Sequence, residues 1–182
     1  MAVNGKFMLT GEKFSPPMLY DFGNYMAFSG NGVYRNRAVC SAIAGNGPLP
    51  LGRYHIVKRP AGSHATVLKT LTKDLLTWWS STPTLHPEWF ALYREDSHMD
   101  DYTFIDNVRR GNFRLHPIGI ADISLGCITL QHRTDFLHIR QILTTYTYGN
   151  QKISGTNLES YGVIEVTDGV TQDVCLQPEK PR

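Results

Sequence analysis

Short apolar runs separated by turn-forming residues dominate the first part of the chain. The runs KFMLT, MLYDFG and YMAFSG are broken by Gly, Asn and Pro, which is typical of a β meander over residues 1–60. A turn cluster at residues 45–52 then leads into an expected strand at residues 53–57. Later runs predict further strands at residues 88–95, 128–131 and 162–167.

Two other stretches show the period of a helix. Apolar residues recur at steps of three and four between residues 65 and 79, and Pro83 ends this pattern. Thr134 is a plausible N-cap for a second helix. The apolar face of that second helix would consist of Phe136, Ile139, Leu143 and Tyr146. The whole pattern predicts a mostly β (α+β) fold with about two helices, in a single domain over residues 1–182.

Composition narrows the class of protein. The 182 residues are 41% hydrophobic and 19% charged, as in globular domains. A net charge of +2 without a run of Lys or Arg argues against nucleic-acid binding. No apolar run approaches the roughly 20 residues of a membrane helix, and the opening MAVNGKFMLTGEKF lacks the pattern of a secretory signal. We therefore expect synthesis in the cytoplasm without a signal peptide, no membrane insertion, and any export by another route.

The stretch RLHPIGIADISLGCITL, residues 114–130, carries candidate chemistry. Cys127 follows a Ser-Leu-Gly turn, and His116 lies a short loop upstream. An imidazole can accept the proton of a thiol, which at its usual pKa of about 8.5 is mostly protonated at neutral pH. Gly126 would let backbone N–H groups approach an oxyanion, and Ser124 would place a hydroxyl at the rim. The residues alone leave open the alternative that Cys127 and His116 are ordinary core side chains.

The number of cysteines bears on redox state and on metals. Three cysteines do not form a disulfide framework, although one pair could bridge in an oxidising compartment. The sequence does not select the pair, but the chemistry above favours Cys127 as the free thiol. His132 and His138 could be grouped with His116 and Cys127 as zinc ligands, but no two of them have a compact ligand spacing. We therefore expect no metal and no cofactor.

Two stretches resemble a known family. HPIGIADISLGCITL is similar to the active-site signature of L,D-transpeptidases, and most similar to its compact form in the type VI secretion L,D-transpeptidase effectors. Residues 28–57 resemble the upstream region of the same family. The matching positions there are Gly47, Pro48, Pro50, Gly52 and Tyr54. The resemblance implies an L,D-transpeptidase-like β-sandwich, with Cys127 as the nucleophile and His116 as its general base.

The same resemblance assigns roles to further residues. Those that would shape the site and its oxyanion hole are Ser124, Gly126 and Gly119. Those that would contact the substrate are Thr129, Arg114 and Tyr54. Housekeeping L,D-transpeptidases read Ser-His-Gly-Cys and carry an Arg two residues later, where this chain has Leu125 and Thr129. Arg109, Arg110 and Arg114 could replace this missing carboxylate clamp, with at least two of them expected at the surface.

The implied substrate is the stem tetrapeptide of peptidoglycan. The resemblance implies attack on the bond between meso-diaminopimelate and D-Ala, and transfer of the resulting thioester to water or to a free D-amino acid. It also implies an antibacterial effector that is secreted by type VI secretion components into the periplasm of a target cell. A periplasmic immunity protein would then protect sister cells.

Two rival functions remain open at this point. A papain-like peptidoglycan amidase or endopeptidase would also use Cys and His, but those enzymes place the Cys before the His in the chain. A non-catalytic wall-binding module would need neither residue.

Two other features of the sequence each have a structural and a functional interpretation. The aromatic residues Trp78, Trp79, Trp89 and Phe90 are expected in the core rather than in a sugar groove. The acidic stretch at residues 95–101 would be a solvated turn or a lid.

Overall fold

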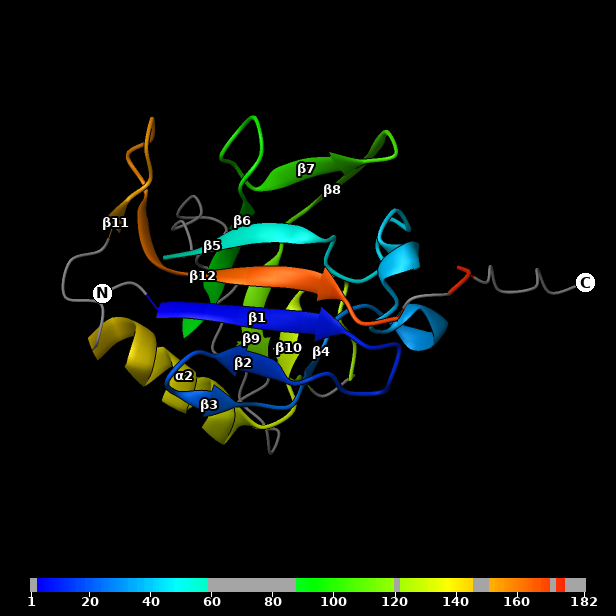
Figure 1. The fold of residues 1–182 in the computed structure, drawn as a ribbon, viewed down its shortest axis with the longest axis horizontal. Helices are drawn as coiled ribbons and strands as arrows, with labels where there is room; N and C mark the ends of the chain where they lie inside the picture. The colour runs from blue at the N-terminus through cyan, green and yellow to red at the C-terminus, as the bar shows by residue number, and fades with distance from the viewer. Residues whose placement is uncertain (1–2, 59–87, 120–121, 146–150, 171–172, 176–182) are drawn as a thin grey trace, which may run out of the picture.

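The computed structural model describes residues 3–58, 88–119, 122–145, 151–170 and 173–175. Within these residues the chain forms a curled ten-stranded sheet, a separate two-stranded hairpin and one α-helix (Figure 1). The sheet consists of β1 (Val3–Leu9), β2 (Pro17–Leu19), β3 (Gly23–Asn24), β4 (Ala27–Phe28), β5 (Gly52–Lys58), β6 (Phe90–Arg94), β9 (Arg114–Pro117), β10 (Ile128–Leu130), β11 (Gln151–Lys152) and β12 (Glu159–Asp168). The hairpin consists of β7 (Tyr102–Ile105) and β8 (Val108–Gly111), and the helix is α2 (Arg133–Thr145). The mostly β, α+β class is confirmed.

The order of strands in the sheet is β3-β2-β1-β12-β5-β6-β9-β10-β4, with β11 paired to β12. β1 and β12 run parallel, from Val3 opposite Gly162 to Leu9 opposite Asp168. β9 and β10 are also parallel, whereas β12–β5, β5–β6 and β6–β9 are antiparallel. The first and last strands of the described chain therefore lie side by side in the sheet.

The strands predicted at residues 53–57, 88–95, 128–131 and 162–167 correspond to β5, β6, β10 and β12. The predicted meander over residues 1–60 is correct only for β1, β2 and β3. β4 leaves that edge and pairs with β10 at the opposite edge, and β5 lies in the centre between β12 and β6. Local hydrophobic patterns identify strands but carry no information on which distant strand each will pair with.

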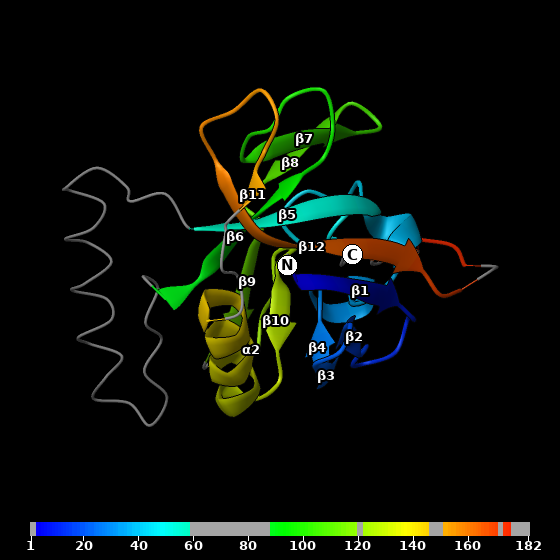
Figure 2. The same cartoon turned by 60° about the vertical axis from the view of Figure 1, so that its left-hand side comes forward.

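Helix α2 lies beside β9 and β10, at the end of the sheet opposite the β7–β8 hairpin (Figure 2). Its buried residues Phe136, Ile139, Ile142 and Leu143 join the main hydrophobic core with strand residues such as Leu115 and Leu130. The predicted N-cap is wrong by two positions. The backbone N–H of Phe136 donates to the carbonyl of His132, so the first turn begins at Arg133 and Thr134 lies inside it. Tyr146 and the helix predicted at residues 65–79 lie outside the described residues.

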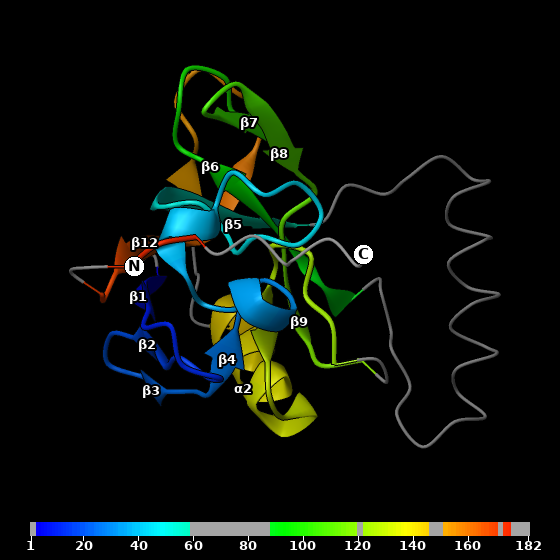
Figure 3. The same ribbon diagram turned by 90° about the vertical axis from the view of Figure 1, so that its right-hand side faces the viewer.

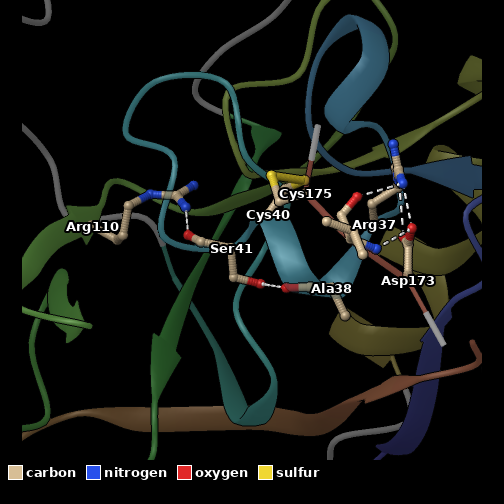
Figure 4. The surroundings of a disulfide bond; sticks show 8 residues. Arg37, Ala38, Cys40, Ser41, Arg110, Asp173 and Cys175 are labelled. Atoms are coloured by element: carbon tan, nitrogen blue, oxygen red, sulfur yellow. Dashed lines mark hydrogen bonds and ion pairs between the residues drawn. A yellow bond between two sulfur atoms is a disulfide. The ribbon is translucent and has the colours of Figure 1, made fainter. Parts of the chain in front are cut away.

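A disulfide fastens the last described segment to the body of the fold. Cys40, at the end of the short 3-10 turn η2 (Ala38–Cys40), bonds to Cys175 across 135 residues of sequence. Arg37 adds an ion pair to Asp173 and a hydrogen bond to the carbonyl of Val174 (Figure 4). Figure 3 shows this segment running beside η2 and the neighbouring turn η1 (Gly32–Tyr34). Cys127 is the free cysteine, as its chemistry predicted.

No helix in the described part of the chain is long and apolar enough to cross a membrane.

Candidate active site

The parallel pairing of β9 and β10 brings His116 next to the residues that follow Cys127. Leu115 lies opposite Ile128 and His116 opposite Thr129. The Thr129 hydroxyl lies 3.3 Å from His116 Nε2, so both side chains share one face of the strand pair. Cys127 immediately precedes β10 and lines the same cleft as His116. The geometry thus gathers a thiol, an imidazole and a hydroxyl.

His116 is held in one orientation from three sides. Its Nδ1 lies 2.7 Å from the carbonyl oxygen of Pro117, and a carbonyl only accepts, so Nδ1 carries the proton. Nε2 is then the nitrogen with the lone pair, on the side of Thr129. The ring of Trp89 stacks on the imidazole with centroids 4.2 Å apart and an interplanar angle of 19°. The neutral imidazole is therefore in the tautomer that a general base acting through Nε2 requires.

Cys127 is a half-buried free thiol just before β10. Its Sγ lies 3.8 Å from the carbonyl oxygen of Asn112. Burial raises the pKa of the Cys127 thiol to about 11, although a hydrogen bond from the Arg114 backbone and the positive charge of Arg114 act in the opposite direction. The resting form is the neutral thiol, so nucleophilic attack requires a base that removes its proton.

Cys127 and His116 line the same cleft, which has a volume of about 670 Å³. The cleft lies between the β7–β8 hairpin, the start of β6, the ends of β9 and β10, and the loop before β5. Its other lining residues are Gly45, Trp89, Tyr102, Arg109, Arg110, Gly111, Asn112, Arg114, Ile123 and Leu125. A concave site with a nucleophile and a base is the arrangement expected of a covalent catalyst.

The Ser-Leu-Gly-Cys turn has a tightly constrained backbone. Ser124 is fully buried and its hydroxyl donates to the carbonyl of Cys127 at 2.8 Å, so it closes the turn and does not lie at the rim of the cleft. Gly126 has a φ of +108°, and a Cβ there would lie 2.8 Å from the guanidinium of Arg110 and 3.0 Å from the ring of Phe113. Only glycine combines this backbone conformation with such close neighbours.

Three other predicted residues are not among the lining residues of the cleft. Tyr54 is fully buried, its hydroxyl donates to the carbonyl of Pro50 at 2.8 Å, and burial raises its pKa. In this structure Tyr54 therefore packs in the core, and the predicted substrate contact has no counterpart among the residues that line the cleft. Thr129 is also fully buried and contacts His116 rather than open space. Gly119 does not line the cleft, and a Cβ there would meet nothing within 4 Å.

One family model matches most of the chain. Residues 23–154, well over half of the chain, match the model of the Tlde1 domain. The chain belongs to the Tlde1 family. Its members are type VI secretion effectors that are related to L,D-transpeptidases and target peptidoglycan, so the expected family is confirmed. The match contains both His116 and Cys127. No curated protein matches the chain.

The three cleft arginines of this Tlde1 domain have different environments. Arg114 is half-buried and binds the carboxylate of Asp101 through two hydrogen bonds of 2.5 and 2.6 Å. Arg110 is buried, and burial lowers its pKa; it donates to the carbonyls of Ser41, Gly47 and Pro48. Only Arg109 is exposed. The expectation that at least two of the three lie at the surface is therefore wrong.

The acidic stretch at residues 95–101 is attached to neighbouring strands rather than simply solvated. Asp101 pairs with Arg114, and Asp96 accepts a hydrogen bond of 2.7 Å from the hydroxyl of Thr103. Among the described residues no group of three or more His, Cys, Asp or Glu side chains could hold a metal ion.

Two contacts of the Tlde1 site escaped the sequence analysis. Trp89 was expected only as a core residue, but the antiparallel register of β6 and β9 continues to place it opposite His116. Arg110 was expected only as a possible clamp, yet it joins the loop at residues 41–48 to the turn at Gly126. Both contacts depend on strand pairing, which a single sequence does not reveal.

Proposed function

We propose that this protein is a cysteine L,D-carboxypeptidase and L,D-transpeptidase. It cleaves the bond between meso-diaminopimelate and D-Ala in stem tetrapeptides through a thioester, and exchanges the terminal D-amino acid. The observation that carries this proposal is that Cys127 and His116 line one cleft, with His116 on β9 and Cys127 directly before the paired strand β10. Membership of a peptidoglycan-targeting family supports the choice of substrate.

In the first half of the reaction, His116 Nε2 accepts the proton of the Cys127 thiol as Sγ attacks the carbonyl carbon of meso-diaminopimelate. Backbone N–H groups of the Gly126–Cys127 turn stabilise the oxyanion. The tetrahedral intermediate collapses, the C–N bond breaks, and the imidazolium donates its proton to the departing amine of D-Ala. The flat contact with Trp89 stabilises the positive charge that His116 carries at this stage.

In the second half, a water molecule or the amine of a D-amino acid attacks the thioester. His116 takes the proton of this nucleophile, and the thiolate that leaves recovers a proton to restore the thiol. Water gives a tripeptide, and a D-amino acid gives an exchanged tetrapeptide. The hydrogen bond from Nδ1 to Pro117 keeps the ring in place throughout.

Delivery to the periplasm of a target cell by a type VI secretion system is part of the same proposal, together with a periplasmic immunity protein in the producer. The Cys40–Cys175 disulfide supports an oxidising place of action, because disulfides persist in the periplasm and are reduced in the cytosol.

The test is mass spectrometry of disaccharide-tetrapeptides incubated with the protein and with Cys127→Ala, with and without D-methionine. The expected products are the disaccharide-tripeptide and a D-methionine adduct, both formed only by the protein with the thiol. A peptide released from its sugar would instead support an amidase. Intact tetrapeptide with the wild-type protein would favour the wall-binding module.

A further inference from the structure

The cleft is positively charged among its described lining residues. Three arginines and one histidine line it, and no Asp or Glu does. The charge of one of these arginines, Arg114, is neutralised by an ion pair with Asp101, which is not a lining residue of the cleft. A stem tetrapeptide has several free carboxylates, including the C-terminus of D-Ala and the second carboxyl group of meso-diaminopimelate. The charge of the cleft is therefore complementary to the substrate proposed above.

The guanidinium groups of two of the three arginines already bind acceptors within the protein. The guanidinium of Arg114 binds the Asp101 carboxylate through both of its terminal nitrogens. The guanidinium of Arg110 donates hydrogen bonds to backbone carbonyls of the loop at residues 41–48. Moving either side chain toward a ligand would leave the partly buried carboxylate of Asp101 or several buried carbonyls without a donor, which is costly.

Arg109 is different because its position follows from the register of the hairpin. Thr103 and Arg110 are paired and buried on one face of the hairpin, so the alternate residues Tyr102 and Arg109 lie on its other, exposed face. Both Tyr102 and Arg109 are lining residues of the cleft. The guanidinium of Arg109 lies 3.7 Å from the centre of the Tyr102 ring. Within the described residues, the Arg109 guanidinium makes this ring contact and no side-chain hydrogen bond or ion pair.

Stacking on an aromatic ring holds a guanidinium by its face and leaves its edge of N–H donors available. That edge matches the two oxygens of a carboxylate. We propose that Arg109, positioned by Tyr102, binds a carboxylate of one of the two residues joined by the scissile bond and selects substrates in which this group is free. This inference rests on the proposed stem-peptide substrate. The carboxylate is that of the terminal D-Ala or the free one of meso-diaminopimelate.

A measurement of ligand binding tests the role of Arg109 independently of whether the protein turns the substrate over. Calorimetry would measure the dissociation constant of disaccharide-tetrapeptide for the Cys127→Ala protein, alone and with Arg109→Ala, Arg109→Lys or Arg53→Ala. Arg53 is the matched control, an exposed arginine that pairs with Glu95 away from the cleft. Two further ligands carry an amide in place of the D-Ala carboxylate or of the free meso-diaminopimelate carboxylate.

Arg109→Ala should weaken binding of the parent ligand roughly 10- to 100-fold, as for loss of a charge-assisted hydrogen-bond pair. Arg109→Lys should recover part of the affinity, and Arg53→Ala should have no effect. With one of the two amides, the proteins with and without Arg109 should bind equally, which identifies the carboxylate.

The inference is overturned if Arg109→Ala binds like Arg53→Ala, or if its loss of affinity is the same for both amides as for the parent ligand. Failure of the wild-type protein to convert a ligand that it binds through Arg109 would contradict the proposed reaction but not this site.

Discussion

At the scale of single residues, the site depends on a thiol that resists ionisation and a glycine that cannot be replaced. Burial dominates the environment of Cys127, and the nearby charges of Arg114 and Asp101 largely oppose each other. The nucleophile is therefore generated during the reaction by transfer of a proton to His116, rather than stored as a thiolate. This distinguishes the site from cysteine enzymes with a preformed ion pair.

The first prediction concerns the pH dependence of Cys127 alkylation by iodoacetamide without reductant. Because burial raises the pKa of Cys127 to about 11, the alkylation rate should still be rising at pH values well above the usual pKa of a thiol. The urea-unfolded protein, with its disulfide intact, is the control and should show the ordinary midpoint. A folded-state midpoint below the unfolded one would contradict the account, since it would mean a stored thiolate.

The second prediction compares two glycines of the same segment. Gly126→Ala should lower the free energy of unfolding by about 2 kcal/mol or more and abolish activity, because φ is +108° and the new methyl group meets Arg110 and Phe113. Gly119→Ala should change stability by less than about 0.5 kcal/mol, because its surroundings are open. Urea unfolding of both variants is the measurement. Equal losses would show that the turn at Gly126 is not under the constraint described.

At the scale of elements, the cleft is assembled from strands that are not neighbours in sequence. The parallel pair β9–β10 places Thr129 against His116, and the antiparallel pair β6–β9 places Trp89 against the other side of the ring. The β7–β8 hairpin supplies arginines to both of its faces. Arg110 on the buried face joins the hairpin to the loop at residues 41–48 (Figure 4).

The third prediction tests this joint. Arg110→Ala leaves several buried carbonyls without their donor and should lower the free energy of unfolding by about 3 kcal/mol. Arg109→Ala, at the neighbouring exposed position, should leave stability within about 0.5 kcal/mol of wild type. Thermal and urea unfolding would measure both. If the two variants are equally stable, Arg110 does not hold the loop in place.

At the scale of the whole molecule, the sequence predicts local features such as strands but not the pairing of segments that are far apart in the chain. Strands β5, β6, β10 and β12 were predictable because alternation and turn residues are local signals. Cys127 and His116 were recognisable as candidate site residues because the family signature that contains them is a compact stretch of sequence. The parallel pairing of β1 with β12 was not predictable, because it joins residues more than a hundred positions apart. Tyr54 matched a family position, but a motif does not say which way a side chain faces, and Tyr54 points into the core.

The fourth prediction concerns the long-range link between Cys40 and Cys175. A cross-link that closes 135 residues restricts the unfolded chain, so its loss should lower the free energy of unfolding by about 3–5 kcal/mol. The measurement is urea unfolding with and without dithiothreitol, with a Cys40→Ala/Cys175→Ala double variant. Cys127→Ala is the control and should respond to the reductant as the wild type does. Equal stability of the oxidised and reduced proteins would mean that the disulfide contributes nothing.

The central claim is that Cys127 forms an acyl-enzyme with the stem peptide. The most direct measurement is intact-protein mass spectrometry after acid quenching of the protein mixed with disaccharide-tetrapeptide. The account predicts a mass increase equal to the acyl group of the disaccharide-tripeptide, mapped to Cys127 and absent from Cys127→Ala, which also forms no tripeptide. Tripeptide formation by Cys127→Ala at the wild-type rate, or an adduct on another residue, would contradict it.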